Sequence, residues 1–236
     1  MSCGEMSRKL VRHLGLATPP VALAFVDHPP PDVPEPASEV PSACTFWRRA
    51  ESEVFFAPAE SHFNCPVGAM VMGFELPEAV GQRLMGLVED MCGCSYLVPT
   101  EASNIPTMDR PAKGIVYGPL HDFPIAPDLI LMWLTPRQAM LWAEAAGTSQ
   151  WTESAPTAAT GRPACAALPL ALGGDRPSLS LGCTGMRTFT DIQDDRMLAV
   201  LPAGRGEEFL ARLGATLEAN QSMAGYYRSR KAQLAG

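Results

Sequence analysis

The stretch at residues 61–68 reads Ser61-His62-Phe63-Asn64-Cys65-Pro66-Val67-Gly68, and it predicts a turn that leads into a helix. Asn64 is a favoured N-cap residue, and Pro66 suits the first helical turn because its fixed φ is already helical. Cys65 would then lie at the positive end of a helix dipole, where a thiolate is stabilised. We expect a functional site around this turn.

Outward from this turn, strands and helices follow one another irregularly. The spacing of apolar residues predicts helices near 6–15, 42–50, 65–72, 77–93, 135–147 and 207–231. Apolar runs predict strands at 20–26, 54–57, 114–119, 128–134 and 197–201, with a further edge strand at 165–172. The edge position follows from Pro169, which cannot donate to a central ladder. Because strands and long helices do not alternate regularly, we predict an α+β fold, a mixed β-sheet with packed helices.

The chain of 236 residues is long enough to bury a sizeable core, and we predict a single domain over residues 1–236. Residues 29–41 contain six prolines and three acids, which predicts a Pro-rich surface loop. Residues 104–113 and 148–162 are polar or rich in Pro and Gly, and are predicted to be loops as well.

Composition excludes several classes of protein. The net charge of −7 argues against nonspecific nucleic-acid binding, which needs a basic face. The basic group at residues 228–231 is short and is predicted to be a solvated helix end. No apolar run approaches the roughly 20 residues of a membrane span, and the first residues do not resemble a secretory signal. We therefore expect a cytoplasmic protein without a membrane partner.

The chain has seven cysteines, and disulfides are not expected in the cytoplasm. Metal-binding, redox or nucleophilic roles are favoured instead. Cys44, Cys65, Cys165 and Cys183 are the candidate metal ligands, because four thiolates suit an iron–sulfur cluster or a closed zinc site. The absence of any Cys-x-x-Cys pair makes this pattern less specific than a zinc ribbon. The alternative is four small buried hydrophobes, but at least three of these cysteines fall at predicted turns or helix starts.

His62 precedes Cys65 by three residues, so the two side chains could reach one ligand. His62 could bind a metal, or it could act as a base toward the thiol of Cys65 or Cys183. These three residues are the catalytic candidates. The alternative for His62 is a hydrogen-bonded structural residue.

The turn Gly182-Cys183-Thr184-Gly185-Met186-Arg187 suggests contact with a ligand. Gly182 and Gly185 would permit positive φ angles and a close backbone approach, and Arg187 could bind a carboxylate or phosphate. We take these three residues as candidate cofactor-binding residues. The alternative is a tight turn in which Arg187 pairs with a structural acid such as Asp191.

The remaining cysteines carry weaker signals. Cys92 and Cys94 flank one glycine and could form a redox dithiol. They lie at the C-terminal end of a predicted helix, however, where the dipole disfavours a thiolate, so a structural role is favoured. Cys3 lies near the terminus and is assigned no role.

Five stretches resemble a known family: residues 43–47, 62–68, 117–120, 161–166 and 181–187. They are similar to the uncharacterised bacterial and archaeal family called domain of unknown function 169, once labelled an archaeal cysteine-rich protein. The resemblance implies one domain over nearly the full length and draws attention to Cys44, Cys65 and Cys183. It implies no assigned reaction.

Together these observations predict a cysteine-rich metalloprotein that binds an iron–sulfur cluster, with zinc as the alternative, for electron transfer or ligand sensing. The expected partner is a redox protein or a small anionic ligand. Two other functions remain open. One is a metal-free enzyme with a cysteine nucleophile, and the other is a non-enzymatic binder of a small anion.

Overall fold

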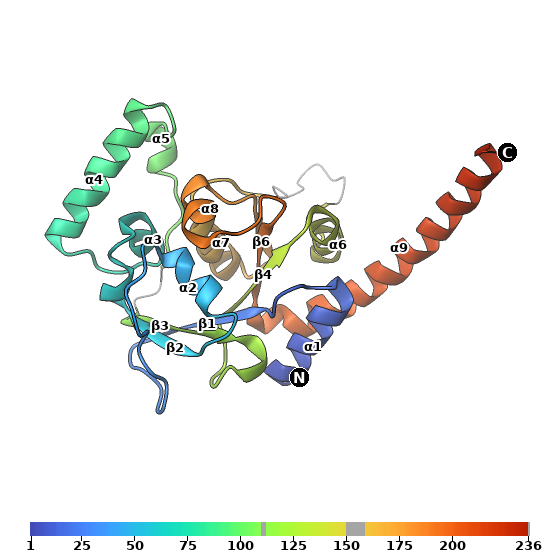
Figure 1. Cartoon of the computed structure of the whole chain (residues 1–236), viewed down its shortest axis with the longest axis horizontal. Coiled ribbons are helices and arrows are strands. Elements are labelled where there is room, and N and C mark those ends of the chain that lie inside the picture. The colour runs from blue at the N-terminus through green and yellow to red at the C-terminus, as the bar shows by residue number, and fades with distance from the viewer. Residues whose placement is uncertain (110–111, 150–158, 236) are drawn as a thin grey trace.

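One antiparallel β-sheet organises the protein, for which a computed structural model describes residues 1–109, 112–149 and 159–235. The strand order is β2-β3-β1-β4-β6-β5 (Figure 1). The strands are β1 (Val21–Val26), β2 (Phe55–Pro58), β3 (Gly114–Pro119), β4 (Leu129–Leu134), β5 (Ser178–Ser180) and β6 (Met197–Pro202). All neighbouring pairs of these strands are antiparallel.

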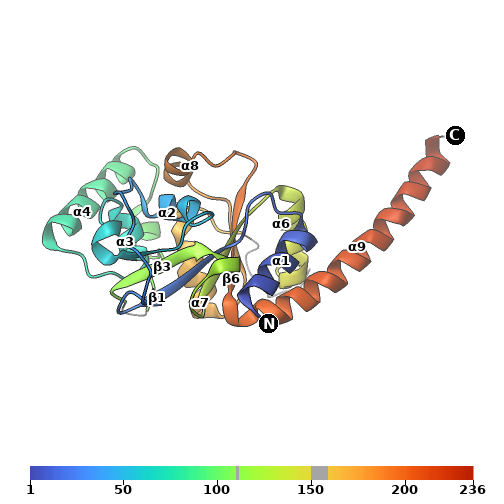
Figure 2. The ribbon, with the colours of Figure 1, turned by 60° about the horizontal axis from the view of Figure 1, so that its bottom comes forward.

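Helices pack on both faces of this sheet, so the predicted α+β class is confirmed (Figure 2). The described α-helices are α1 (Cys3–Leu14), α2 (Ala43–Arg49), α3 (Pro66–Val71), α4 (Glu78–Gly93), α5 (Pro99–Ala102), α6 (Pro136–Ala146), α7 (Ala167–Gly174), α8 (Thr184–Thr190) and α9 (Gly206–Ala235).

Alternation along the strands divides the interior into two cores, because successive side chains point to opposite faces of a sheet. In β1, Val21, Leu23 and Phe25 join the core that includes residues of α2, α3, α7 and α8. Ala22 and Ala24 join the other core, with residues of α1, α6 and α9. The central strands β1, β3 and β4 are buried on both faces, which explains their nearly continuous apolar sequences.

Capping residues set the helix ends that the sequence predicted. The Ser2 hydroxyl accepts a hydrogen bond from the Glu5 amide at 3.2 Å, and α1 ends at Gly15, whose φ of 65° is left-handed. Thr135 and Gln138 form a capping box at the start of α6, and Gly147 follows its last residue.

The predicted edge strand at 165–172 is wrong. A short 3-10 helix, η3 (Ala164–Ala166), leads there into helix α7. An apolar run of this length fits a buried helix as well as a buried strand, and Pro169 lies in the first turn of α7, where its missing N–H costs nothing.

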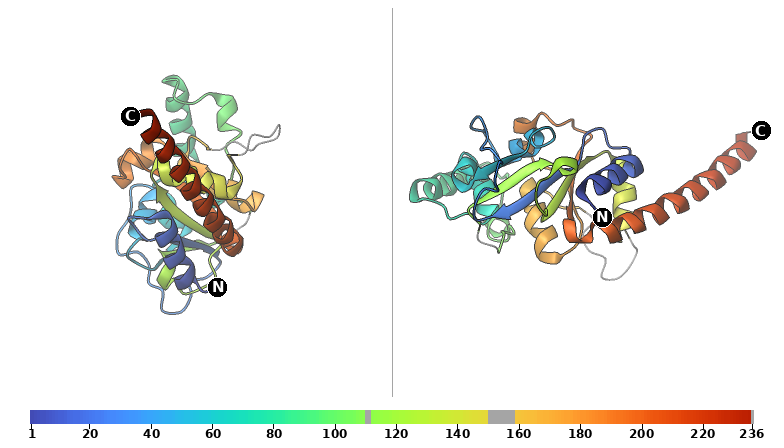
Figure 3. Two further views of the ribbon diagram at one scale, coloured as in Figure 1. Left: turned by 90° about the vertical axis from the view of Figure 1, so that its right-hand side faces the viewer. Right: turned by 90° about the horizontal axis from the view of Figure 1, so that it is seen from below.

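Two helices extend away from the sheet at opposite ends of the molecule (Figure 3). One is α4, and the other is the C-terminal half of α9. Residues 29–41 contain no helix or strand, as predicted. Of the predicted loops at 104–113 and 148–162, residues 110–111 and 150–158 lie outside the described residues. Within the described chain, no helix combines the length and apolar character needed to cross a bilayer.

Candidate functional site

Four short segments on one side of the sheet carry the cysteines predicted to converge. Cys44 lies in the first turn of α2, and Cys65 and Cys183 are the residues that cap α3 and α8. Cys165 lies in η3. Cys165 belongs to the core on this side, and Cys44 and Cys183 pack against it. We call Cys44, Cys65, Cys165 and Cys183 the four-cysteine site.

The four thiols are close enough for their charges to affect one another. Burial raises the pKa of Cys165 well above its ordinary value, and charge on each of the other three thiols raises it further. Burial also raises the pKa of Cys44 to about 12, with further contributions from Cys65 and Cys183. The structure therefore brings together side chains that are up to 139 positions apart in the sequence.

The site has a buried end and a more accessible one. Cys165 is only 8% exposed, whereas Cys44, Cys65 and Cys183 are half-buried. Within residues 1–109, 112–149 and 159–235, no group of three or more His, Cys, Asp or Glu side chains is placed to hold a metal ion. A [4Fe–4S] cluster makes a different demand, because there each thiolate binds its own iron atom and the cluster fills the space between them.

Polar groups next to the sulfur atoms fix two of the cysteines. The Ser42 hydroxyl lies 3.3 Å from Cys44 Sγ and 3.1 Å from the Thr45 hydroxyl. The Met186 amide donates to Cys183 Sγ at 3.4 Å, in the manner of an N-cap. Both arrangements place a hydrogen-bond donor on a sulfur that could become a ligand.

Gly68 allows α3 to approach α2 closely. A Cβ atom at this position would lie 2.9 Å from the Cβ of Ala43 and 3.1 Å from Cys65 Sγ. Those distances are too short for a larger residue, so a glycine here keeps Cys65 next to the start of α2.

His62 is fully committed to internal hydrogen bonds. It is 1% exposed, its Nδ1 lies 3.0 Å from the Pro58 carbonyl oxygen, and its Nε2 lies 2.9 Å from the Tyr117 hydroxyl. Burial lowers the pKa of His62 to about 4. Neither ring nitrogen is free to bind a metal or to receive a proton from Cys65 in this arrangement. His62 therefore matches the alternative of a hydrogen-bonded structural residue.

Tyr117 was not predicted as a site residue. It lies on β3, and burial, followed by charge on Cys44 and Cys165, raises the pKa of its hydroxyl well above the ordinary value. The position of Tyr117 in a strand whose alternate residues face this core is the signal in the sequence that could have identified it.

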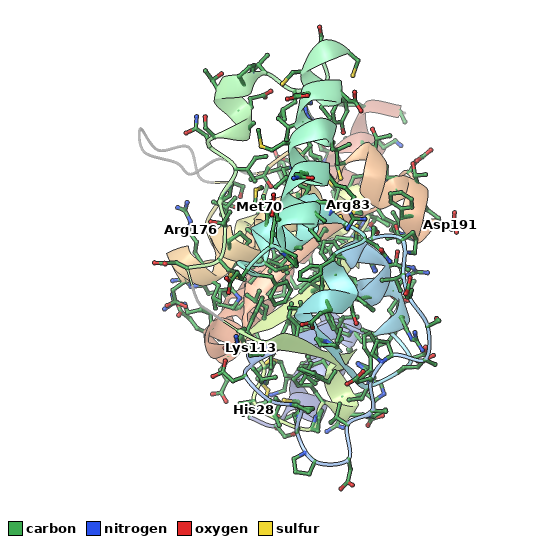
Figure 4. The ribbon with its side chains drawn as sticks, turned by 90° about the vertical axis from the view of Figure 1, so that its left-hand side faces the viewer. His28, Met70, Arg83, Lys113, Arg176 and Asp191 are labelled. Atoms are coloured by element: carbon green, nitrogen blue, oxygen red, sulfur yellow. The ribbon has the colours of Figure 1, made fainter. Side chains whose placement is uncertain are left out.

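Arg187 binds backbone carbonyl groups. Its guanidinium donates to the carbonyl oxygens of Leu181 at 2.8 Å, Arg196 at 3.0 Å and Gln193 at 3.2 Å. It therefore joins the turn before α8 to the loop after it. The predicted alternative partner, Asp191, instead ends α8 at the molecular surface with a φ of 50° (Figure 4).

The two glycines of this turn have different surroundings. Gly182 has a φ of 89°, and a Cβ there would lie 2.6 Å from Met186 Cε, so both backbone conformation and packing favour glycine. Gly185 lies inside α8 with no heavy atom within 4 Å of an added Cβ.

Cys92, Cys94 and Cys3 lie outside the four-cysteine site. Cys92 and Cys94 are at the far end of α4, where Cys94 is exposed and donates to the Met91 carbonyl oxygen at 3.5 Å. Cys3 lies on α1 and packs against the core on the opposite face of the sheet.

Comparison with known proteins identifies the family. No curated protein and no solved structure matches this chain. The family model DUF169, described as "Uncharacterised ArCR", matches residues 9–212, a span that contains all four residues of the four-cysteine site. The chain therefore belongs to the uncharacterised DUF169 family.

Proposed function

We propose that Cys44, Cys65, Cys165 and Cys183 hold an iron–sulfur cluster and that the protein acts in electron transfer or in ligand sensing. The observation that carries this proposal is the gathering of four cysteines from four separate segments on one side of the sheet, close enough for their charges to interact. Soft thiolates are the usual ligands of such clusters, and four of them are the usual complement. When bound, the cluster would supply one-electron redox chemistry.

The surroundings of the four-cysteine site suit this role. Hydrogen bonds to cluster ligands tune the reduction potential, and donors from Ser42 and the Met186 amide lie beside Cys44 and Cys183. The half-buried positions of Cys44, Cys65 and Cys183 would leave one side of the cluster near solvent, within reach of a redox partner or a small ligand.

A metal-free cysteine enzyme is less well supported. The raised pKa values of Cys44 and Cys165 keep these two thiols protonated at neutral pH, so neither adds a nucleophile to the candidates Cys65 and Cys183. His62, the candidate base, has both nitrogens in hydrogen bonds. Metal binding to such thiols would instead displace their protons.

A binder of a small anion is also less well supported. Arg187 was the cation expected to bind the anion, but its guanidinium already donates hydrogen bonds to three backbone carbonyl oxygens. Zinc remains the alternative metal, because the same four thiolates would serve it.

The test is to purify the protein without oxygen and to measure iron, zinc and acid-labile sulfide per chain. We expect iron and sulfide in comparable amounts. Replacing Cys44, Cys65, Cys165 or Cys183 by Ser should lower both, whereas the matched variants Cys92→Ser and Cys94→Ser should keep them. Zinc without sulfide would show that the site holds zinc and not a cluster. Protein free of both metals would refute the proposal.

A further inference from the structure

The C-terminal half of α9 has a stripe of large apolar side chains that are largely exposed. Asn220 still donates to Glu144 of α6, and the end of α9 beyond it projects from the body of the protein (Figures 1 and 3). Met223, Tyr227 and Leu234 lie on one side of it and are 47%, 63% and 71% exposed, with Tyr226 beside them. A stripe of large apolar side chains on a projecting helix is typical of a surface that binds another protein.

A partly covered apolar side lies on α4, at the other end of the molecule. Leu84, Leu87, Val88 and Met91 share this side of the helix with Val80; Val80 is buried, and the other four are half-buried. None of them belongs to either hydrophobic core described above. The base of α4 is fixed to the protein by Arg83, which donates to the Phe63 carbonyl oxygen at 3.0 Å (Figure 4).

The two helices carry opposite charge. Residues 221–235 contain Arg228, Arg230 and Lys231 and no acid, whereas α4 and the three residues before it contain four acids and one arginine. The acids are Glu75, Glu78, Glu89 and Asp90. Within the described residues, no ion pair involves any of these four acids or the three basic residues of α9. Both groups of charges are therefore free to attract an opposite charge on another molecule.

We propose that the end of α9 (residues 221–235) in one copy of this protein packs along α4 of a second copy. The lengths match, since 15 and 16 residues of helix each span about 23 Å. Pairing α9 with α9 would place three cations against three cations, and pairing α4 with α4 would oppose two acidic helices. The α9–α4 pair joins positive charge to negative charge, and it sets the exposed apolar stripe of α9 against the half-buried apolar side of α4.

A closed dimer can contain this contact twice. Because α4 and the end of α9 lie at opposite ends of the molecule, two copies in antiparallel orientation place each α9 next to the α4 of the other (Figure 3). A twofold axis between them makes the two contacts identical, and it leaves no α9 or α4 unpaired. The four-cysteine site takes no part in this pairing, so the dimer does not depend on the proposed cluster.

The test is a charge exchange in the full-length chain, followed by size-exclusion chromatography with light scattering. We expect the wild type to be a dimer at micromolar concentration. The triple variant Arg228→Glu/Arg230→Glu/Lys231→Glu should be a monomer, and so should Glu89→Lys/Asp90→Lys. Combining all five substitutions should restore the dimer, because the end of α9 is then negative, the end of α4 is positive, and the two again attract each other. Circular dichroism of each variant provides the control for folding.

Other results would overturn the proposal. These are a monomeric wild type at micromolar concentration, or a dimer that survives both charge-reversed variants. Flotation with phosphatidylserine vesicles tests a different occupant of the apolar stripe. A wild type that is monomeric in solution but binds these vesicles through Arg228, Arg230 and Lys231 would assign the end of α9 to a lipid surface instead.

Discussion

The Tyr117 hydroxyl donates a hydrogen bond to Nε2 of His62 at 2.9 Å and thereby joins β3 to the turn that precedes α3. The direction of this bond follows from the other side of the ring. Nδ1 lies 3.0 Å from the Pro58 carbonyl oxygen, which can only accept, so Nδ1 carries the proton and Nε2 must accept. Both side chains are buried, and the pair supports the segment that leads to Cys65.

Replacing Tyr117 by Phe should destabilise the protein. The ring would still fit, but Nε2 of His62 would be left buried without a donor, which costs about 1–3 kcal/mol. Urea unfolding of the two proteins at neutral pH measures the difference. Tyr96→Phe is the matched control, because the Tyr96 hydroxyl makes no hydrogen bond within the described residues and its removal should leave the free energy of unfolding unchanged. Equal stability of Tyr117→Phe and wild type would contradict the assigned hydrogen bond.

Stability should fall as the pH drops from about 6.5 to 4. The pKa of His62 is about 4 in the folded protein and 6.5 ordinarily, so the unfolded chain binds the extra proton in this range. The contribution of neutral His62 to the free energy of unfolding is therefore complete above pH 6.5. It decreases as the pH falls toward the pKa of the folded state, by about 3 kcal/mol in total. Urea unfolding as a function of pH measures this slope.

His62→Gln provides the comparison, because it removes this titration and leaves every carboxyl group in place. The variant should be less stable at neutral pH but should lose less stability on acidification. If both proteins showed the same slope between pH 4 and 6.5, another group would be responsible for it.

Much of the fold and part of the site could be predicted from the sequence, since local patterns determine them. Ser2, Thr135 and Gly147 cap helices as their residue types suggest, and the apolar runs at 20–26, 114–119 and 128–134 form central strands. The segments that carry the four cysteines were identified because three of them lie at turns or helix starts.

What the sequence could not predict depends on contacts between distant segments. His62 meets Tyr117, 55 residues away, and Arg187 binds carbonyl oxygens of neighbouring loops, which no side-chain pattern reveals. Residues 165–172 are apolar almost throughout, so their spacing favours neither helix nor strand. The packing of α7 against β5 and β6 decides that they form a helix.

Alkylation should distinguish the cysteines in metal-free protein. Cys94 is exposed, whereas burial raises the pKa of Cys44 to about 12 and that of Cys165 well above its ordinary value. Iodoacetamide reacts with the thiolate, so at mildly alkaline pH Cys94 should be modified well before Cys44 and Cys165. Peptide mass spectrometry over time gives the order. Rapid modification of Cys165 would show that the buried end of the four-cysteine site is open to solvent.

Replacing Gly68 by Ala should impair the four-cysteine site without touching any cysteine. The added Cβ would lie 2.9 Å from the Cβ of Ala43 and 3.1 Å from Cys65 Sγ, so either α3 moves away from α2 or the Cys65 side chain turns away. We expect several-fold less iron and sulfide per chain after anaerobic purification, and a stability loss of about 1–3 kcal/mol from overpacking.

Gly81→Ala is the matched control, because Gly81 lies in α4 with no heavy atom within 4 Å of an added Cβ. This variant should keep its iron and gain up to about 1 kcal/mol of stability, because alanine favours a helix interior over glycine by about that amount. Full iron loading of Gly68→Ala would mean that Cys65 tolerates displacement or is not a ligand. Metal analysis of Cys65→Ser separates these two explanations. Loss of iron in this variant would show that Cys65 is a ligand that tolerates displacement, and full iron loading would show that it is not a ligand.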